Sequence, residues 1–174
     1  AILERQNRLY GAGEAVMRSI EDLAQPDSVA VVTGQQVGLF TGPVYTIYKA
    51  LTTLRLAAEL RRRQIRAVPI FWMESEDHDL AEVTRFTDLN RSGKATDLRE
   101  SLFGSVQESI RPVGSIRFPE GIHQAVAQYL DGLPDSEWKL DIRTQLQSAC
   151  KPGATFSESF GKLMAHLFGS QGLV

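Results

Sequence analysis

Residues 29–43 read VAVVTGQQVGLFTGP and decide the fold of this chain. The stretch begins with Val29–Val32, a short apolar run rich in β-branched residues, which is typical of a strand buried on both faces. Three glycines follow within nine residues: Gly34, Gly38 and Gly42. Pro43 comes next, and proline is well tolerated in the first turn of a helix. The pattern predicts a strand, a glycine loop (Thr33–Pro43), and a helix that starts near Pro43 with Thr41 or Gly42 as its cap.

A long helix and a second strand follow the glycine loop. Apolar residues at helical spacing predict one buried face of the helix, formed by Val44, Ile47, Tyr48, Leu51, Leu54 and Ala58. The run Val68–Met73 predicts the second strand, and an acidic segment, Glu74–Asp79, follows it directly with the sequence ESEDHD. Two strands joined by one helix form a parallel pair whose carboxyl ends lie together. The predicted fold class is therefore α/β, with the glycine loop and the acidic segment at one end of the sheet.

The glycine loop has two interpretations. Glycine lets a backbone approach a ligand closely, and a loop that leads into a helix leaves backbone N–H groups for an anion. On this interpretation the loop binds phosphate or carboxylate, with help from Gln35, Gln36 and Thr41. On the other interpretation it is a turn that needs flexible residues. The loop matches neither the P-loop nor the dinucleotide-binding motif. Lys49, further along the helix, is interpreted as a solvated lysine.

The acidic segment also has two interpretations. Carboxylates are costly to bury unless they are paired or hydrogen-bonded, so four acids within six residues are either solvated or used. If used, they hold a substrate ammonium, bind Mg²⁺, or act as general bases, with His78 as a proton shuttle. If not, they form a solvated loop in which Asp77 or Asp79 caps a helix that starts at Leu80.

The composition is typical of a soluble enzyme domain. The 174 residues carry a net charge of −2, which gives no electrostatic case for nucleic acid. No apolar run is long enough to cross a bilayer, so no membrane partner is expected. Cys150 is the single cysteine, which suits a reducing cytoplasm, and it is interpreted as a structural residue. His78, His123 and His166 lack metal-ligand spacing, so no zinc site is predicted and no residue is named as a metal ligand.

We expect one Rossmann-like domain over residues 1–174, in which residues 87–150 form an insertion or helical subregion with a turn at 90–94. Further helices are predicted over residues 2–23, with a break near Gly11 and Gly13, and over 121–130, 135–150 and 156–168. Residues 172–174 are typical of the start of a further strand. The domain is therefore expected to be truncated at its carboxyl-terminal end.

Several motifs together resemble the BshC family, the cysteine-adding ligases of bacillithiol biosynthesis. They are TGQQ at 33–36, GLF at 38–40, GP at 42–43, YTIYKA at 45–50, FW at 71–72, SEDHD at 75–79, QN at 6–7, PGATFS at 152–157 and LFG at 167–169. The resemblance implies a Rossmann-like core similar to the nucleotidyltransferase-like fold of class I aminoacyl-tRNA synthetases. Those enzymes carry a histidine-containing phosphate motif, and the FTGP at 40–43 occupies the similar place without histidine.

The resemblance also implies a reaction. It joins the carboxyl group of cysteine to the amine of glucosaminyl-malate, which forms an amide, with ATP as the expected co-substrate and Mg²⁺ left open. Family members are much longer than this chain, so it is expected to be an amino-terminal fragment that is inactive alone. The missing part is expected to hold a coiled coil and a homodimer contact.

The candidate site joins both clusters. The expected catalytic residues are Asp77, His78 and Asp79. The expected substrate- or nucleotide-binding residues are Thr33, Gly34, Gln35, Gln36, Gly38, Thr41, Gly42, Tyr45, Ser75 and Glu76. Two alternatives stay open at this point: a nucleotide- or sugar-binding scaffold without catalysis, and, more weakly, metal-dependent hydrolysis by the carboxylates.

Overall fold

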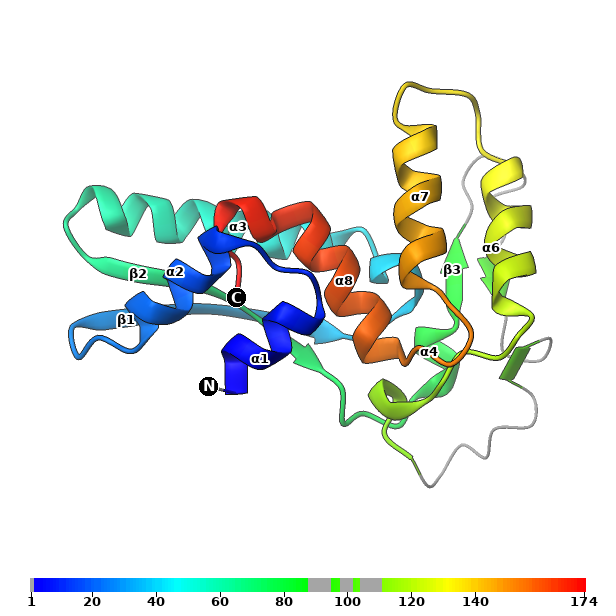
Figure 1. The fold of residues 1–174 in the computed structure, drawn as a ribbon, viewed down its shortest axis with the longest axis horizontal. Coiled ribbons are helices and arrows are strands. Elements are labelled where there is room, and N and C mark those ends of the chain that lie inside the picture. The colour runs from blue at the N-terminus through cyan, green and yellow to red at the C-terminus, as the bar shows by residue number, and fades with distance from the viewer. Residues whose placement is uncertain (1, 88–94, 98–101, 104–110) are drawn as a thin grey trace. The chain divides into compact units, whose positions relative to one another are not determined.

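The computed structural model describes residues 2–87, 95–97, 102–103 and 111–174 (Figure 1). Its internal contacts divide the chain into two compact units. The first unit comprises the residues up to Gln35, Pro43–Glu74 and Met164–Val174, and the second comprises Gln36–Gly42 and Ser75–Leu163. The chain thus passes from the first unit to the second after Gln35 and again after Glu74, at the carboxyl ends of the first two strands.

The first unit is built on two neighbouring strands, β1 (Ser28–Gln36) and β2 (Arg66–Glu74), which run in the same direction (Figure 1). Helix α3 (Tyr45–Arg62) connects them. At the end of the chain, the N–H of Val174 donates to the carbonyl of Pro69 at 3.1 Å, and its carbonyl accepts from the N–H of Phe71 at 2.8 Å. This alternation is the pattern of parallel strands. The predicted α/β class is confirmed, and Val174 pairs with β2 as the predicted further strand requires.

Helices surround this sheet. Helices α2 (Glu14–Leu23) and α3 both pack against β2. Helix α1 (Ile2–Leu9) precedes α2, and Gly11 between them has a φ of +82°, so the predicted break is confirmed. Helix α8 (Phe156–Phe168) and the short helix η3 (Gly169–Gln171) lead to the end of the chain. The apolar core of the first unit includes Val16, Met17, Ala50, Leu54, Ala57, Ala67, Val68 and Phe71.

The prediction that β1 is buried on both faces is wrong. Val29 is 42% exposed and Val32 is 55% exposed. The physical reason lies in the helix packing, because α2 and α3 pack mainly against β2. Among the described residues, the valines of β1 therefore line an open surface.

The predicted buried face of α3 is also wrong in most of its members. Val44, Tyr48 and Leu51 are exposed, and the buried residues are Thr46, Ala50, Thr53, Leu54 and Ala57. Four of these five side chains are alanine or threonine, so the buried residues of the helix that packs against β2 are mainly small. The helix begins at Tyr45 with Val44 as its N-cap and no side-chain cap, so the predicted capping by Thr41 or Gly42 is wrong as well.

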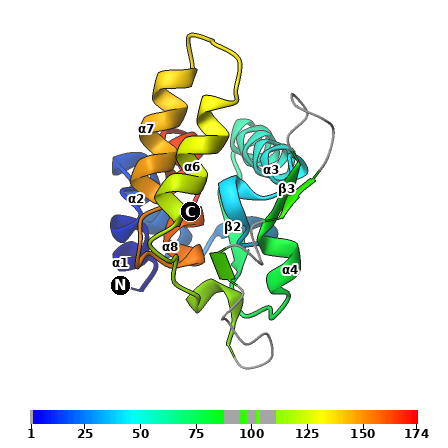
Figure 2. The same cartoon turned by 90° about the vertical axis from the view of Figure 1, so that its right-hand side faces the viewer.

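The second unit contains the remaining elements. Its short elements are η1 (Leu39–Thr41), α4 (Leu80–Val83), the antiparallel pair β3 (Arg85–Thr87) and β4 (Ala95–Asp97), and η2 (Val113–Ser115). Helices α6 (Ile122–Asp131) and α7 (Lys139–Ala149) lie side by side as a hairpin in Figures 1 and 2. These two helices and α8 were predicted close to their observed bounds, whereas the predicted turn at 90–94 lies outside the described residues.

Three aromatic rings form the centre of the second unit. The ring centroid of Phe156 lies 5.5 Å from that of Phe103 and 4.8 Å from that of Phe118. Backbone hydrogen bonds also join residues 116–118 to residues 153–156, and Arg117 and Thr155 form an antiparallel bridge. The start of α8 is therefore tied to the segment that follows η2. No helix in the described part of the chain has the length and apolar character that crossing a membrane requires.

Candidate functional site

The Gln36–Gly42 part of the glycine loop has a strained backbone. Phe40 and Thr41 have φ values of +53° and +75°, and Gly42 has +70°. Residues other than glycine rarely adopt this left-handed region, so the surrounding structure must hold them there. The ring of Phe40 stacks on that of Tyr129 with centroids 5.2 Å apart and planes 11° apart. A Cβ on Gly38 would lie 3.1 Å from the Cα of Gly42, so the loop also closes on itself.

The side chain of Asp77 is fixed by hydrogen bonds from two directions. Its Oδ2 accepts a bond from Nε2 of Gln36, and its Oδ1 accepts from the backbone N–H groups of His78 at 2.5 Å and Asp79 at 3.0 Å. The carboxamide of Gln36, and after it the N–H of Asp79, hold the pKa of the Asp77 carboxyl below its ordinary value of 3.8. Asp77 therefore stays ionised at neutral pH. It serves as a fixed acceptor, and its low pKa makes it a weak base.

The other two predicted catalytic residues differ from Asp77. The Oδ1 of Asp79 accepts the N–H of Glu82 at 2.9 Å, so Asp79 is the N-cap of α4. The sequence predicted that either Asp77 or Asp79 would cap this helix, and the structure shows that Asp79 does. His78 is exposed, and within the described residues no hydrogen-bond partner is found for its imidazole. The ring of His78 is therefore accessible to a ligand beside an ionised carboxylate.

The backbone of the acidic segment is held by a segment that the sequence did not single out. The N–H of Val113 donates to the carbonyl of Asp77 at 2.7 Å, and the N–H of Gly114 donates to the carbonyl of Ser75 at 3.0 Å. A Cβ on Gly114 would lie 2.5 Å from the Cβ of Ser75 and 2.4 Å from Oγ of Ser157. Only glycine fits between these groups. A lone glycine in a turn is common, so the sequence carried no signal for this contact.

A second group of predicted residues lies in the first unit, at the end of β1. Lys49 of α3 donates from Nζ to the carbonyl of Gly34 at 3.2 Å and to Oε1 of Gln35 at 3.0 Å. Its Nζ also lies 5.1 Å from the centroid of the Tyr45 ring. Lys49 is exposed, as its interpretation as a solvated lysine predicts, and it also makes two hydrogen bonds that the sequence did not predict. Helix α3 places Lys49 over the end of β1, the strand that precedes the helix. This contact cannot be predicted from the position of Lys49 along its own helix.

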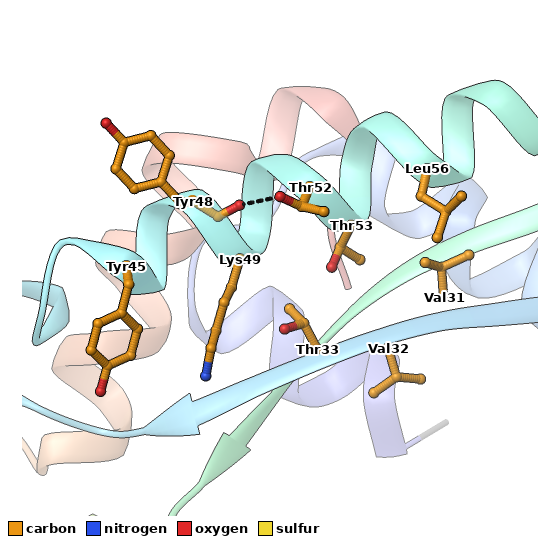
Figure 3. Close-up of a pocket in the computed structure, with 9 residues that line it drawn as sticks. All are labelled: Val31, Val32, Thr33, Tyr45, Tyr48, Lys49, Thr52, Thr53 and Leu56. Carbon is orange, nitrogen blue, oxygen red and sulfur yellow. Dashed lines mark hydrogen bonds between the residues drawn. The ribbon is translucent and has the colours of Figure 1, made fainter.

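Lys49 and Tyr45 line an open groove between β1 and α3 (Figure 3). The groove has a volume of about 390 Å³ and is lined on the strand side by Val31, Val32 and Thr33. From α3 the side chains of Tyr45 and Lys49 extend toward the strand (Figure 3). Val31 and Val32 of β1 thus form one wall of a concave surface.

The predicted site residues fall into two groups. The structure brings part of the loop and the acidic segment together in the second unit, where Gln36 contacts Asp77. The other predicted site residues in this unit are Gly38, Thr41, Gly42, Ser75, Glu76, His78 and Asp79. Thr33, Gly34, Gln35 and Tyr45 lie in the first unit with Lys49. Lys49, Val113 and Gly114 are the contacts that reasoning from sequence missed.

The described residues bear on two kinds of ligand, a metal ion and an anion held by backbone N–H groups. No three His, Cys, Asp or Glu side chains among them lie together in a way that could hold a metal ion. The N–H groups of Gly42, Thr46 and Ile47, which a loop of this type would offer to phosphate, already donate to Leu39, Pro43 and Val44. The anion cradle predicted for the loop therefore has fewer available backbone donors than its glycine content suggests.

The fold and these clusters define a class of protein. A parallel strand–helix–strand unit, with polar loops at the carboxyl ends of its strands, is the framework of Rossmann-like domains. The family model described as "Bacillithiol biosynthesis BshC, N-terminal Rossmann-like domain" matches residues 1–174. This chain belongs to the BshC family.

The chain is similar to relatives that carry the name "Putative cysteine ligase BshC". It is 41% identical to the protein of Salinibacter ruber over 97% of this chain and 30% of the relative. It is 38% identical to that of Chlorobaculum tepidum over 99% of this chain and 31% of the relative, and 37% identical to that of Symbiobacterium thermophilum over 100% and 33%. The chain therefore spans about a third of the length of these relatives.

Proposed function

We propose that the whole protein that carries this chain is a ligase that adds cysteine to glucosaminyl-malate during bacillithiol biosynthesis. The bond formed is an amide between the carboxyl group of cysteine and the amine of the glucosamine. Membership of the BshC family and the name that its relatives carry support the assignment as a cysteine ligase. The observation that carries a catalytic role for this domain is the Gln36–Asp77 hydrogen bond, which fixes an ionised carboxylate beside the accessible ring of His78.

Asp77 is assigned to substrate binding. An amine substrate arrives mainly as an ammonium, and an ionised carboxylate is a suitable acceptor for it. The bonds from Gln36 and from two backbone N–H groups keep the Asp77 carboxylate charged and in place. Because its pKa is lowered, Asp77 orients the amine and does not take its proton.

His78 is assigned to proton transfer. The amine must lose a proton before its lone pair can attack a carboxyl carbon, and imidazole is the side chain best suited to this at neutral pH. The proton passes to His78 as the new C–N bond forms and the leaving group departs from the carboxyl carbon. Asp79 supports this arrangement structurally, because it caps the helix that follows His78.

ATP is part of the proposal as a co-substrate, because amide formation from a free carboxylate needs an activated carboxyl group. We assign no single residue to ATP and leave a Mg²⁺ requirement open. A cytoplasmic location, a coiled coil outside this chain and a homodimer also belong to the proposal. They rest on the family resemblance.

The test is bacillithiol content in cells that lack their own cysteine-adding gene and receive the whole protein. Thiol labelling and mass spectrometry measure both bacillithiol and glucosaminyl-malate. We expect bacillithiol to be restored, and His78→Gln to lower its rate of formation by about 100-fold. His123→Gln, on the exposed side of α6, is the matched control and should leave the rate unchanged. Accumulation of glucosaminyl-malate despite soluble protein would favour a binding scaffold instead.

A further inference from the structure

The ammonium of Lys49 is held without a counter-charge among the described residues. Its two hydrogen-bond partners, the carbonyl of Gly34 and the amide oxygen of Gln35, are both neutral. Arg62 and Arg63, at the other end of the same helix, each pair with the carboxylate of Glu59 at 3.1 Å. A lysine ammonium has three donors, and two are used here. Lys49 therefore retains one donor and its full charge.

The bond from Lys49 also decides which way the Gln35 carboxamide faces. Lysine can only donate, so the atom of Gln35 that faces Nζ at 3.0 Å must be the amide oxygen. The amide NH₂ group of Gln35 is then on the far side and offers two further donors. The Gln35 carboxamide can both donate and accept hydrogen bonds, and the bond from Lys49 leaves its donor group available to a ligand.

The groove beside Lys49 limits the kind of anion that would bind. Its walls are mainly apolar and include Val31, Val32 and the ring of Tyr45, of which the ring lies near the ammonium. Lys49 is the single cation that lines the groove in the described part of the chain. One positive charge balances one negative charge. A phosphate dianion would keep an uncompensated charge against an apolar wall, which is costly. A carboxylate with a short hydrocarbon body matches both the charge and the wall.

We propose that Lys49 and Gln35 form a binding subsite for the carboxylate of a small organic acid, whose carbon chain lies in the groove between β1 and α3. Lys49 supplies the charge and Gln35 supplies an amide donor. The assignment of this subsite to a substrate rests on the proposed function, in which both cysteine and glucosaminyl-malate carry carboxylates. Binding of a carboxylate here does not depend on that function.

The experiment measures binding of butyrate, butyramide and inorganic phosphate to the whole protein by ligand-observed NMR. We expect butyrate to bind and its neutral amide to bind at least about tenfold more weakly, because the charge-assisted bond is lost.

Lys49→Met should weaken butyrate binding by a similar factor. Arg55→Met removes one charge from the same helix outside the groove and should leave binding unchanged. Gln35→Glu should abolish it, since the new carboxylate would pair with Lys49. Circular dichroism checks that each variant is folded.

Three outcomes would overturn the proposal: no butyrate binding to the wild type, equal binding to folded Lys49→Met, or tighter Lys49-dependent binding of phosphate than of butyrate. Measuring the KM for each substrate then tests whether the subsite takes part in the reaction. We expect Lys49→Met to raise the KM for one substrate and Lys49→Arg to restore that KM in part. If the protein binds butyrate through Lys49 but forms no bacillithiol, the ligase proposal fails and the subsite stands.

Discussion

Gln36 donates its side-chain N–H to the carboxylate of Asp77, a residue 41 positions further along the chain. Gln36 is the last residue of β1, and Asp77 lies three residues beyond the end of β2. The bond therefore ties together the segments that leave two parallel strands. It also leaves the amide oxygen of Gln36 as an acceptor, because the NH₂ group is the part that faces Asp77.

Gln36→Leu should raise the pKa of the Asp77 carboxyl toward its ordinary value of 3.8, because the Gln36 hydrogen bond is the largest cause of its lowering. Carboxyl ¹³C NMR titration measures the shift directly. Turnover should fall by about tenfold as the carboxylate loses its fixed position. Gln145→Leu removes an exposed Gln–Asp contact on α7 and serves as the control. An unchanged Asp77 titration in Gln36→Leu would show that this bond does not set its protonation.

Asp77→Asn should change the pH dependence of stability in one direction. A carboxyl whose pKa is lowered by folding contributes stability that is present above its unfolded value of 3.8 and is lost as pH falls through the lower folded value. The variant should therefore be less stable than the wild type at pH 7, by less than about 1 kcal/mol because the group is partly exposed. Thermal midpoints at pH 7 and pH 3 test this, and a difference that grows on acidification would contradict it.

Gly114→Ala should destabilise the fold and displace the acidic segment. Its new Cβ would lie 2.5 Å from the Cβ of Ser75 and 2.8 Å from the Ser75 carbonyl oxygen, so backbone must move. We expect a loss of about 1–3 kcal/mol in the free energy of unfolding. Gly169→Ala is the control, since its Cβ would meet only Val16 at an ordinary 3.8 Å. Equal midpoints for the two variants in urea would refute the close contact at Gly114.

Cys150 should be almost inert to thiol reagents in the folded protein. It is fully buried, its Sγ lies 3.4 Å from Oγ of Ser159, and burial raises the pKa of its thiol to about 11. At pH 8 the small thiolate fraction should slow alkylation by at least about 100-fold relative to an exposed cysteine. Mass spectrometry of the peptide that contains Cys150 measures the rate, with urea-unfolded protein as the reference. Rapid labelling of the native protein would refute this burial.

The sequence predicted the elements that local patterns control. The parallel strand pair, the helix between them and α8 follow from runs of apolar residues and their spacing. The meeting of the glycine loop with the acidic segment follows from the geometry of parallel strands, which places their carboxyl ends together.

Contacts between distant residues could not be predicted in this way. Asp77 and Asp79 have the same side chain, and only the position of Gln36 and the start of α4 separate their roles. The hydrogen bonds of Lys49 were not predicted, because its partner Gln35 lies 14 residues earlier, across the turn from strand to helix. The buried face of α3 was misread because hydrophobicity favoured Tyr48 and Leu51, whereas the buried residues of this helix are mainly small.

The small buried residues of α3 bear on the position of the Lys49 ammonium. Ala50 and Ala57 are almost completely buried, and they belong to the helix that packs against β2. Lys49 is the neighbour of Ala50, and its stem has a fixed length. A larger side chain at position 50 would need space that the packed structure does not offer, so the helix and Lys49 with it would have to shift. Enlarging Ala50 would change the reach of a charged group without altering any polar residue.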